Sequence, residues 1–180
     1  MNFGLEKNML DKIERARLLA TFIHFNQKRR DGENYINHPK RMVESIFKKW
    51  FGEDIWELEE GKDYSFTEEQ ENIICAIWLH DCIEDAKNSY AVAAMIGCHF
   101  SERTMELVRI LTHRKWQSYN EYIERVAQNP QALQIKWEDL RDNSSYFIPK
   151  KQELKYKNAC IFLQGKGIEI PNFLRERFEI

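Results

Sequence analysis

The sequence predicts an all-α protein, and three observations support this fold class. The 180 residues include only seven glycines and four prolines, the residues that interrupt helices most strongly. Apolar residues recur every three to four positions, which is the spacing of helices that bury one face. The strict alternation of half-buried β-strands is hard to find. The length suits a single domain, predicted to span residues 1–180 with its core at about 5–165.

Composition narrows the class of protein. Hydrophobic residues make up 43% of the chain and charged residues 31%, as in globular rather than disordered proteins. The net charge of −2 gives no reason to expect nucleic acid or an anionic membrane as a partner. We find no signal peptide and no apolar run of about 18 residues, the length needed to span a membrane. We therefore expect a cytoplasmic protein whose four cysteines are buried free thiols, and the oligomeric state is left open.

The first part of the chain predicts two helices and a long loop. A helix is indicated by an apolar stripe at helical spacing, formed by Leu5, Met9, Ile13, Ala16, Ala20 and Ile23. A second helix is predicted from Pro39 to about Trp50. Residues 51–66 have no clear period and are predicted to be a long loop or insertion.

The most buried helix is predicted to follow that loop. Thr67 and Gln70 form a capping box, in which the two residues satisfy each other's backbone N–H groups at a helix start. Residues 73–79 are apolar on every side of a helix, so this segment should pass through the middle of the fold. A short helix is predicted from Ser89 through Ala94.

Capping signals divide the second half of the chain into further helices. Ser101 is a predicted cap, Ser118 and Glu121 form a second capping box, and Asn129 precedes a proline at a first helical position. A last helix is predicted over residues 151–164 and is followed by a tail that contains Pro171.

Four ionisable residues follow the central apolar run. His80 and Glu84 are four positions apart, as are Asp81 and Asp85, so in a continuous helix each pair would share a face. These faces continue the apolar run and would otherwise belong to the core. Burying several carboxylates is costly unless a cation compensates their charge, so the pattern favours a metal ion.

Other segments offer further ligands. His38 directly precedes a predicted helix, and Asp139 and Asn143 are four positions apart on another. Two histidines and two aspartates would form a mixed nitrogen and oxygen set that leaves coordination positions open. Such sets suit Mn²⁺, Fe²⁺ or Mg²⁺ better than a closed structural zinc site.

Three motifs in this chain resemble those of a known family. They are H-x-x-Q-x-R-R-x-G-E-x-Y-I-x-H-P at residues 24–39, L-H-D-x-I-E-D at 79–85 and K-x-x-D-L-x-x-N at 136–143. In this order they resemble the hydrolase domain of the RelA/SpoT homologues, which belongs to the HD superfamily of helical phosphohydrolases. Those proteins remove the 3′-diphosphate from the alarmone (p)ppGpp. The short chain is most similar to the stand-alone small alarmone hydrolases.

The resemblance implies a role for each matching residue. The ligands of one divalent metal, with Mn²⁺ expected and Fe²⁺ or Mg²⁺ as alternatives, would be His38, His80, Asp81 and Asp139. The residues handling the attacking water would be Glu84 and Asp85. The contacts to a guanosine nucleotide would come from Arg29, Arg30, Asn143, Lys155 and Tyr156. The expected products are pyrophosphate and GDP or GTP.

Two other functions stay open at this point. One is an HD phosphohydrolase that acts on another nucleotide, such as a 5′-nucleotidase or a nucleoside triphosphate hydrolase. The other is a non-catalytic nucleotide sensor, although a pure binder has no need for Glu84 and Asp85. The sequence departs from the family pattern at Asn34, at Ala86 and in the long 51–66 segment, which bears on the substrate more than on the metal ligands.

Overall fold

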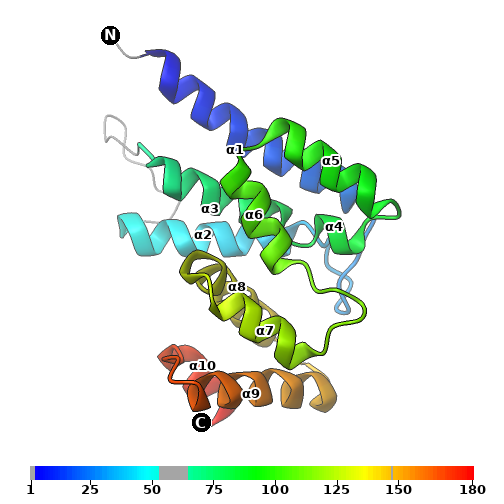
Figure 1. Cartoon of the computed structure of the whole chain (residues 1–180), viewed down its shortest axis with the longest axis vertical. Coiled ribbons are helices and arrows are strands. Elements are labelled where there is room, and N and C mark those ends of the chain that lie inside the picture. Colours follow the sequence, from blue (N-terminus) through cyan, green and yellow to red (C-terminus); the bar gives the residue numbers. More distant parts are fainter. Residues whose placement is uncertain (1–2, 53–64, 147) are drawn as a thin grey trace. The chain divides into compact units, whose positions relative to one another are not determined.

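The computed structural model describes residues 3–52, 65–146 and 148–180, with side chains described from residue 12 onward. Within these ranges every regular element is a helix (Figure 1). One isolated antiparallel bridge joins Lys28 and Asn34. The predicted all-α fold class is therefore confirmed. None of the described helices is long and apolar enough to cross a membrane. The chain separates into two compact units, Met1–Thr112 and His113–Ile180.

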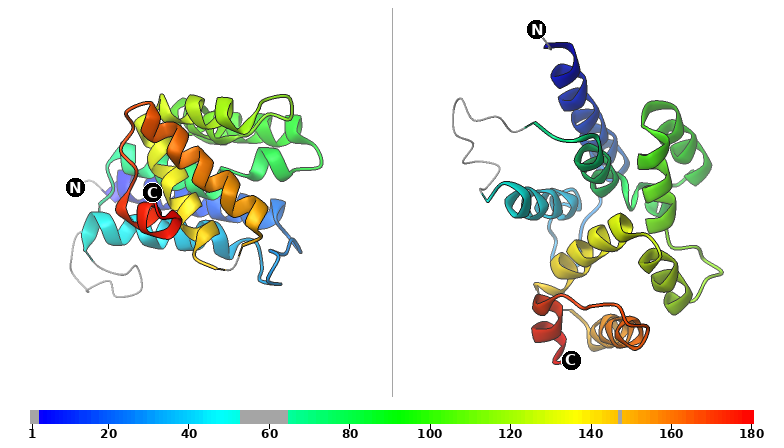
Figure 2. Two further views of the ribbon diagram at one scale, coloured as in Figure 1. Left: turned by 90° about the horizontal axis from the view of Figure 1, so that it is seen from below. Right: turned by 60° about the vertical axis from the view of Figure 1, so that its left-hand side comes forward.

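The helices of the first unit are α1 (Phe3–Ile23), α2 (Asn37–Phe51), α3 (Glu68–Leu79), α4 (Cys82–Asp85), α5 (Ser89–His99) and α6 (Glu102–Leu111). Helix α3 packs against α1, α2 and α6 (Figure 2). All residues from Glu71 to Leu79 are buried, as expected for a segment that is apolar on every side. The predicted central helix is thus confirmed. His80, which directly follows its C-terminal end, is also buried.

Helix boundaries in this unit follow local capping chemistry. The predicted capping box at Thr67 and Gln70 is present. Helix α2 ends at Gly52, whose φ of 75° lies in the left-handed region that glycine adopts readily. Of the predicted 51–66 loop, residues 53–64 lie outside the described part of the chain. Helix α5 continues five residues beyond the predicted end at Ala94, because its buried residue Ile96 extends the apolar stripe of Val92.

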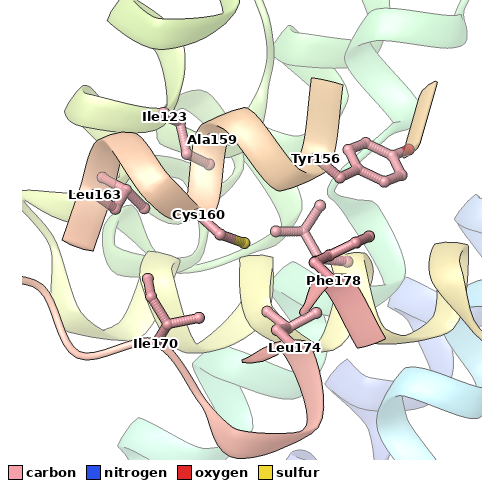
Figure 3. Packing of buried hydrophobic residues seen from close by; sticks show 9 residues of the cluster. Ile123, Tyr156, Ala159, Cys160, Leu163, Ile170, Leu174 and Phe178 are labelled. Atoms are coloured by element: carbon pink, nitrogen blue, oxygen red, sulfur yellow. The ribbon is translucent and has the colours of Figure 1, made fainter. Parts of the chain in front are cut away.

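The helices of the second unit are α7 (Tyr119–Ala127), α8 (Pro130–Ser144), α9 (Lys150–Gly165) and α10 (Asn172–Phe178). The predicted capping box at Ser118 and the cap at Asn129 are both present. A compact apolar cluster joins these helices (Figure 3), formed by Ile123, Leu140, Tyr156, Ala159, Cys160, Leu163, Ile170, Leu174 and Phe178. Because Leu140 belongs to this cluster, the core holds the part of α8 that carries Asp139.

Two details differ from prediction. The tail after Pro171 contains helix α10, whose residues Leu174 and Phe178 lie four positions apart and are both buried. That spacing was the available signal for a short helix. All four cysteines are free, but Cys98 is exposed rather than buried.

Candidate metal centre

The chain breaks its helical path at the HD pair. Helix α3 ends at Leu79, and α4 begins only at Cys82. Asp81 has φ −99° and ψ −6°, which places it in the bridge region next to the α-helical basin. Residues 82–85 therefore form a separate short helix and do not continue α3. Glu84 and Asp85 are exposed instead of lying on a face that continues the core.

His80 is oriented by its own backbone. Its side chain is buried, and Nδ1 lies 2.8 Å from the carbonyl oxygen of Ile77. A carbonyl oxygen only accepts hydrogen bonds, so Nδ1 carries the proton and a neutral ring presents its lone pair at Nε2. That Nε2 lies 2.9 Å from Oδ2 of Asp81. Two atoms with lone pairs at this distance are a suitable pair of ligands for one cation.

His38 comes from the first turn of α2 and lies beside the HD pair. It is 1% exposed, and its ring centroid lies 5.3 Å from that of His80. The hydroxyl group of Tyr35 donates a hydrogen bond to Oδ2 of Asp81. The first unit thus brings together three of the four predicted ligands, and Tyr35 orients one of them.

The fourth predicted ligand lies on α8 of the second unit. The side chain of Asp139 is 7% exposed. Its Oδ2 accepts a hydrogen bond from Lys136 Nζ at 2.6 Å, and its Oδ1 accepts one from Asn143 Nδ2 at 2.5 Å. The predicted placement of Asp139 and Asn143 on one helical face is confirmed. Burial acts to lower the pKa of Lys136, but Asp139 and the neighbouring tyrosines raise it, and the net pKa lies well above its ordinary value.

Three of the four predicted ligands are buried. His38, His80 and Asp139 are all buried and offer the ligand atoms that a metal ion requires. Asp81 is half-buried next to His80.

A second polar group contacts Asp85, one of the predicted catalytic residues. Gln27 Nε2 donates a hydrogen bond to Asp85 Oδ2 at 2.7 Å. His24 Nδ1 lies 2.7 Å from Gln27 Oε1, and His24 is 4% exposed. Burial lowers the pKa of His24 more than its contact with Gln27 and the nearby carboxylates of Asp81 and Asp85 raise it. Neither His24 nor Gln27 is among the predicted site residues, although both match the first motif.

The predicted substrate residues fall in both units. Arg29 and Arg30 lie in a turn after α1, where Arg29 N donates to the carbonyl oxygen of Glu33 and Gly32 has a φ of 88°. Arg30 is exposed, and Arg29 is half-buried. Both arginines are therefore at least partly accessible to solvent.

In the second unit, α9 carries the other predicted contacts. Lys155 is exposed, and its Nζ lies 4.3 Å from the ring centroid of Tyr119. Tyr156 is buried, and its hydroxyl oxygen accepts a hydrogen bond from Gln152 Nε2 at 2.5 Å. Tyr156 therefore also belongs to the apolar cluster and contributes to the packing of the second unit.

Known proteins share both sequence and fold with this chain. No protein-family model matches it. It is 29% identical over 157 residues to guanosine-3′,5′-bis(diphosphate) 3′-pyrophosphohydrolase from Aquifex aeolicus; the match covers 83% of this chain and 20% of that relative. The chain thus spans about a fifth of the length of this curated relative.

A solved structure extends the comparison to the fold. It is a metazoan orthologue of SpoT that hydrolyses ppGpp, with a TM-score of 0.63 and 21% identity over 93% of this chain and 92% of that protein. The predicted resemblance to RelA/SpoT-type hydrolases is confirmed, and the chain has the helical fold of this SpoT orthologue.

Proposed function

We propose that this protein is a metal-dependent phosphohydrolase that removes the 3′-diphosphate from ppGpp or pppGpp. Water is consumed, the 3′ oxygen–phosphorus linkage is broken, and the products are pyrophosphate and GDP or GTP. The observation that carries the proposal is the pairing of His80 Nε2 with Asp81 Oδ2 at 2.9 Å, beside the buried ring of His38. The sequence likeness to a ppGpp pyrophosphohydrolase supports this substrate.

The proposed ligands of one divalent ion are His38, His80, Asp81 and Asp139. Their chemistry fits such an ion, because two imidazoles and two carboxylates provide four ligands and leave room for water. Burial of His38, His80 and Asp139 supports this assignment, since buried ionisable groups are compensated by partners or by metals. We propose Mn²⁺, with Fe²⁺ or Mg²⁺ as alternatives. A bound divalent ion lowers the pKa of its water and so supplies hydroxide near neutral pH.

The chain's own residues would then orient the reactants. Glu84 and Asp85 follow the HD pair on α4 and are exposed, so each can reach solvent and accept the proton of the attacking water. The guanidinium groups of Arg29 and Arg30 can donate paired hydrogen bonds to phosphate oxygens.

Three proposed substrate contacts lie in the second unit. Lys155 is exposed and can neutralise phosphate charge, and it neighbours Tyr156 in sequence. Asn143 holds Asp139 through its Nδ2 atom, so a contact to substrate would use its side-chain oxygen. We also propose that both units belong to one HD domain over residues 1–180. The sequence match and the structural match each cover a larger part of the chain than either unit alone, so each match extends over both units.

The first test is an assay of ppGpp turnover with added Mn²⁺, following GDP and pyrophosphate by chromatography. The wild-type protein should release pyrophosphate only with metal, and Asp139→Ala should abolish this release. Glu84→Gln should also abolish turnover while leaving Mn²⁺ binding, measured by calorimetry, largely intact. If Glu84→Gln removed the metal instead, the role proposed for Glu84 would be wrong.

Other outcomes would redirect the proposal. Turnover of a different nucleotide, with none of ppGpp, would indicate a nucleotidase or triphosphate hydrolase that uses the same metal centre. Binding of Mn²⁺ and ppGpp without any turnover would indicate a nucleotide sensor.

A further inference from the structure

We infer that Gln27 and His24 are positioning residues that hold Asp85 in place for the attack of water. This inference rests on the proposed function, because it assigns a purpose to a contact made by a proposed catalytic residue. It concerns only residues of the first unit.

The contact joins distant parts of the chain. Gln27 Nε2 and Asp85 Oδ2 lie 2.7 Å apart although 58 residues separate them in sequence. Gln27 belongs to the turn that follows α1, and helix α1 also packs against α4, which carries Asp85. This hydrogen bond therefore ties the short helix α4 to the end of the first helix.

The two neighbours of the Gln27 side-chain amide determine which way its oxygen and nitrogen point. A carboxylate accepts hydrogen bonds and donates none, so the amide nitrogen of Gln27 faces Asp85. The amide oxygen must then face His24, whose Nδ1 lies 2.7 Å away and donates its proton. His24 thus prevents the amide from turning over and presenting its oxygen to the carboxylate.

The surroundings of His24 hold its ring in one orientation. Tyr35 stacks on the ring with centroids 4.4 Å apart and an interplanar angle of 27°. Cys82 Sγ lies 3.7 Å from Nε2 and so contacts the ring from its other side. Since the hydroxyl group of Tyr35 also donates to Asp81, one packed group contacts both the ligand Asp81 and the catalytic residue Asp85.

Asp85 needs such support more than a buried residue does. Its side chain is 31% exposed and it lies on a helix of four residues, so a hydrogen bond from another element helps to fix its orientation. Catalytic groups must be held in a productive geometry, and loss of an orienting partner typically costs about 10–100-fold in activity. We therefore expect Gln27 to affect the rate of the chemical step and not the binding of metal or nucleotide.

Two substitutions of Gln27 test whether it positions Asp85. Gln27→Met keeps the length of the side chain but removes both polar atoms, and it should lower kcat about 10–100-fold while KM and the Kd for Mn²⁺ stay unchanged. Gln27→Glu places a second carboxylate against Asp85. Because like charges resist joint ionisation, the acid limb of its kcat profile should move to higher pH. A fall in Mn²⁺ affinity that accounts for the loss of rate, or an unchanged kcat, would overturn the inference.

A matched pair at His24 tests the role of its Nδ1 atom. Asn places its amide nitrogen where Nδ1 lies, whereas the longer Gln places it near Nε2. His24→Asn should therefore retain much more of the wild-type kcat than His24→Gln. Both variants lose ring packing and some stability, so rates are compared well below the melting temperatures measured by circular dichroism. Equal losses of kcat in the two variants would contradict the role of His24.

A measurement without turnover separates this inference from the proposed function. The side-chain amide resonances of Gln27 in a ¹⁵N NMR spectrum should shift in Asp85→Asn and in His24→Leu, but not in Glu84→Gln. If ppGpp is not hydrolysed and these shifts are seen, the proposed substrate fails while the positioning network stands. If the Gln27 resonances do not respond to Asp85→Asn, the network itself is refuted.

Discussion

Asp139 and Asp81, two of the proposed ligands, are held in opposite ways. Asp139 lies inside the unbroken helix α8 and is contacted by Lys136 and Asn143, three residues before it and four residues after it. Asp81 lies where the chain leaves α3, and it is contacted by Tyr35 from 46 positions away. Helical geometry alone brings the partners of Asp139 into range, whereas Tyr35 reaches Asp81 only when the first unit has folded.

This difference separates two kinds of site residue. A ligand held by its own helix depends mainly on charge and burial within one element. A ligand at a helix break depends on a contact between elements, so its geometry responds to changes far away in sequence.

The largest expected effect is at Lys136. Lys136→Met leaves Asp139 buried without its ammonium partner, and removal of one member of a buried ion pair costs about 3 kcal/mol of the free energy of unfolding. Urea denaturation followed by circular dichroism measures this loss. Lys155→Met is the control, because Lys155 is exposed and its contact with the Tyr119 ring contributes only about 0.5–1 kcal/mol. Equal losses of unfolding free energy in the two variants would show that the buried ion pair stabilises the fold no more than the exposed contact does.

Tyr35 tests the other kind of ligand. Tyr35→Phe removes one hydrogen bond to the Asp81 carboxylate, which should cost about 1.5–2 kcal/mol of unfolding free energy. It should also weaken Mn²⁺ binding about 10–100-fold in calorimetry, because Asp81 loses its orienting partner. Tyr119→Phe is a suitable control, since the Tyr119 hydroxyl is buried with no hydrogen-bond partner among the described residues. Its removal should be neutral or stabilising.

The pH dependence of stability should report on His24. Its pKa in the folded protein lies below the ordinary value, chiefly because of burial. The unfolded chain therefore binds a proton at this site more readily as the pH falls below about 6.5. The stabilisation from a neutral His24 is complete above that pH and is lost progressively below it. Thermal melts between pH 7 and pH 5 should fall more steeply for the wild type than for His24→Asn. Parallel curves would contradict this account.

The smallest effects on the free energy of unfolding are expected from loss of a helix cap, and they should be equal in the two units. Thr67→Ala and Asn129→Ala each remove a cap that accepts a hydrogen bond from a backbone N–H, at the start of α3 and of α8 respectively. Each should lower the free energy of unfolding by about 1 kcal/mol in chemical denaturation. A much larger cost at Thr67 would mean that the start of the central helix also depends on long-range contacts.

The same contrast explains how far prediction from sequence reaches. The starts of α3, α6, α7 and α8 were predictable because capping residues act within three or four positions. The break after Leu79 was not, because no glycine or proline occurs between residues 73 and 85 to mark it. The carbonyl contact of His80 and the distant hydroxyl group of Tyr35 accompany that break, and periodicity carries no information about them.

The candidate site shows the same division. Motifs and helical spacing identified the four proposed ligands and placed Asn143 beside Asp139. They did not reveal that Gln27 contacts Asp85, since no local rule joins residues 58 positions apart.

The local group on α8 and the long-range contact between Gln27 and Asp85 should also change in different ways during evolution. Lys136, Asp139 and Asn143 lie within eight consecutive residues, so recombination or the transfer of one short segment carries the group intact. Gln27 and Asp85 lie 58 positions apart, so no single short segment carries both. In an alignment of relatives we expect positions 27 and 85 to vary together, whereas the α8 group should be inherited as a block.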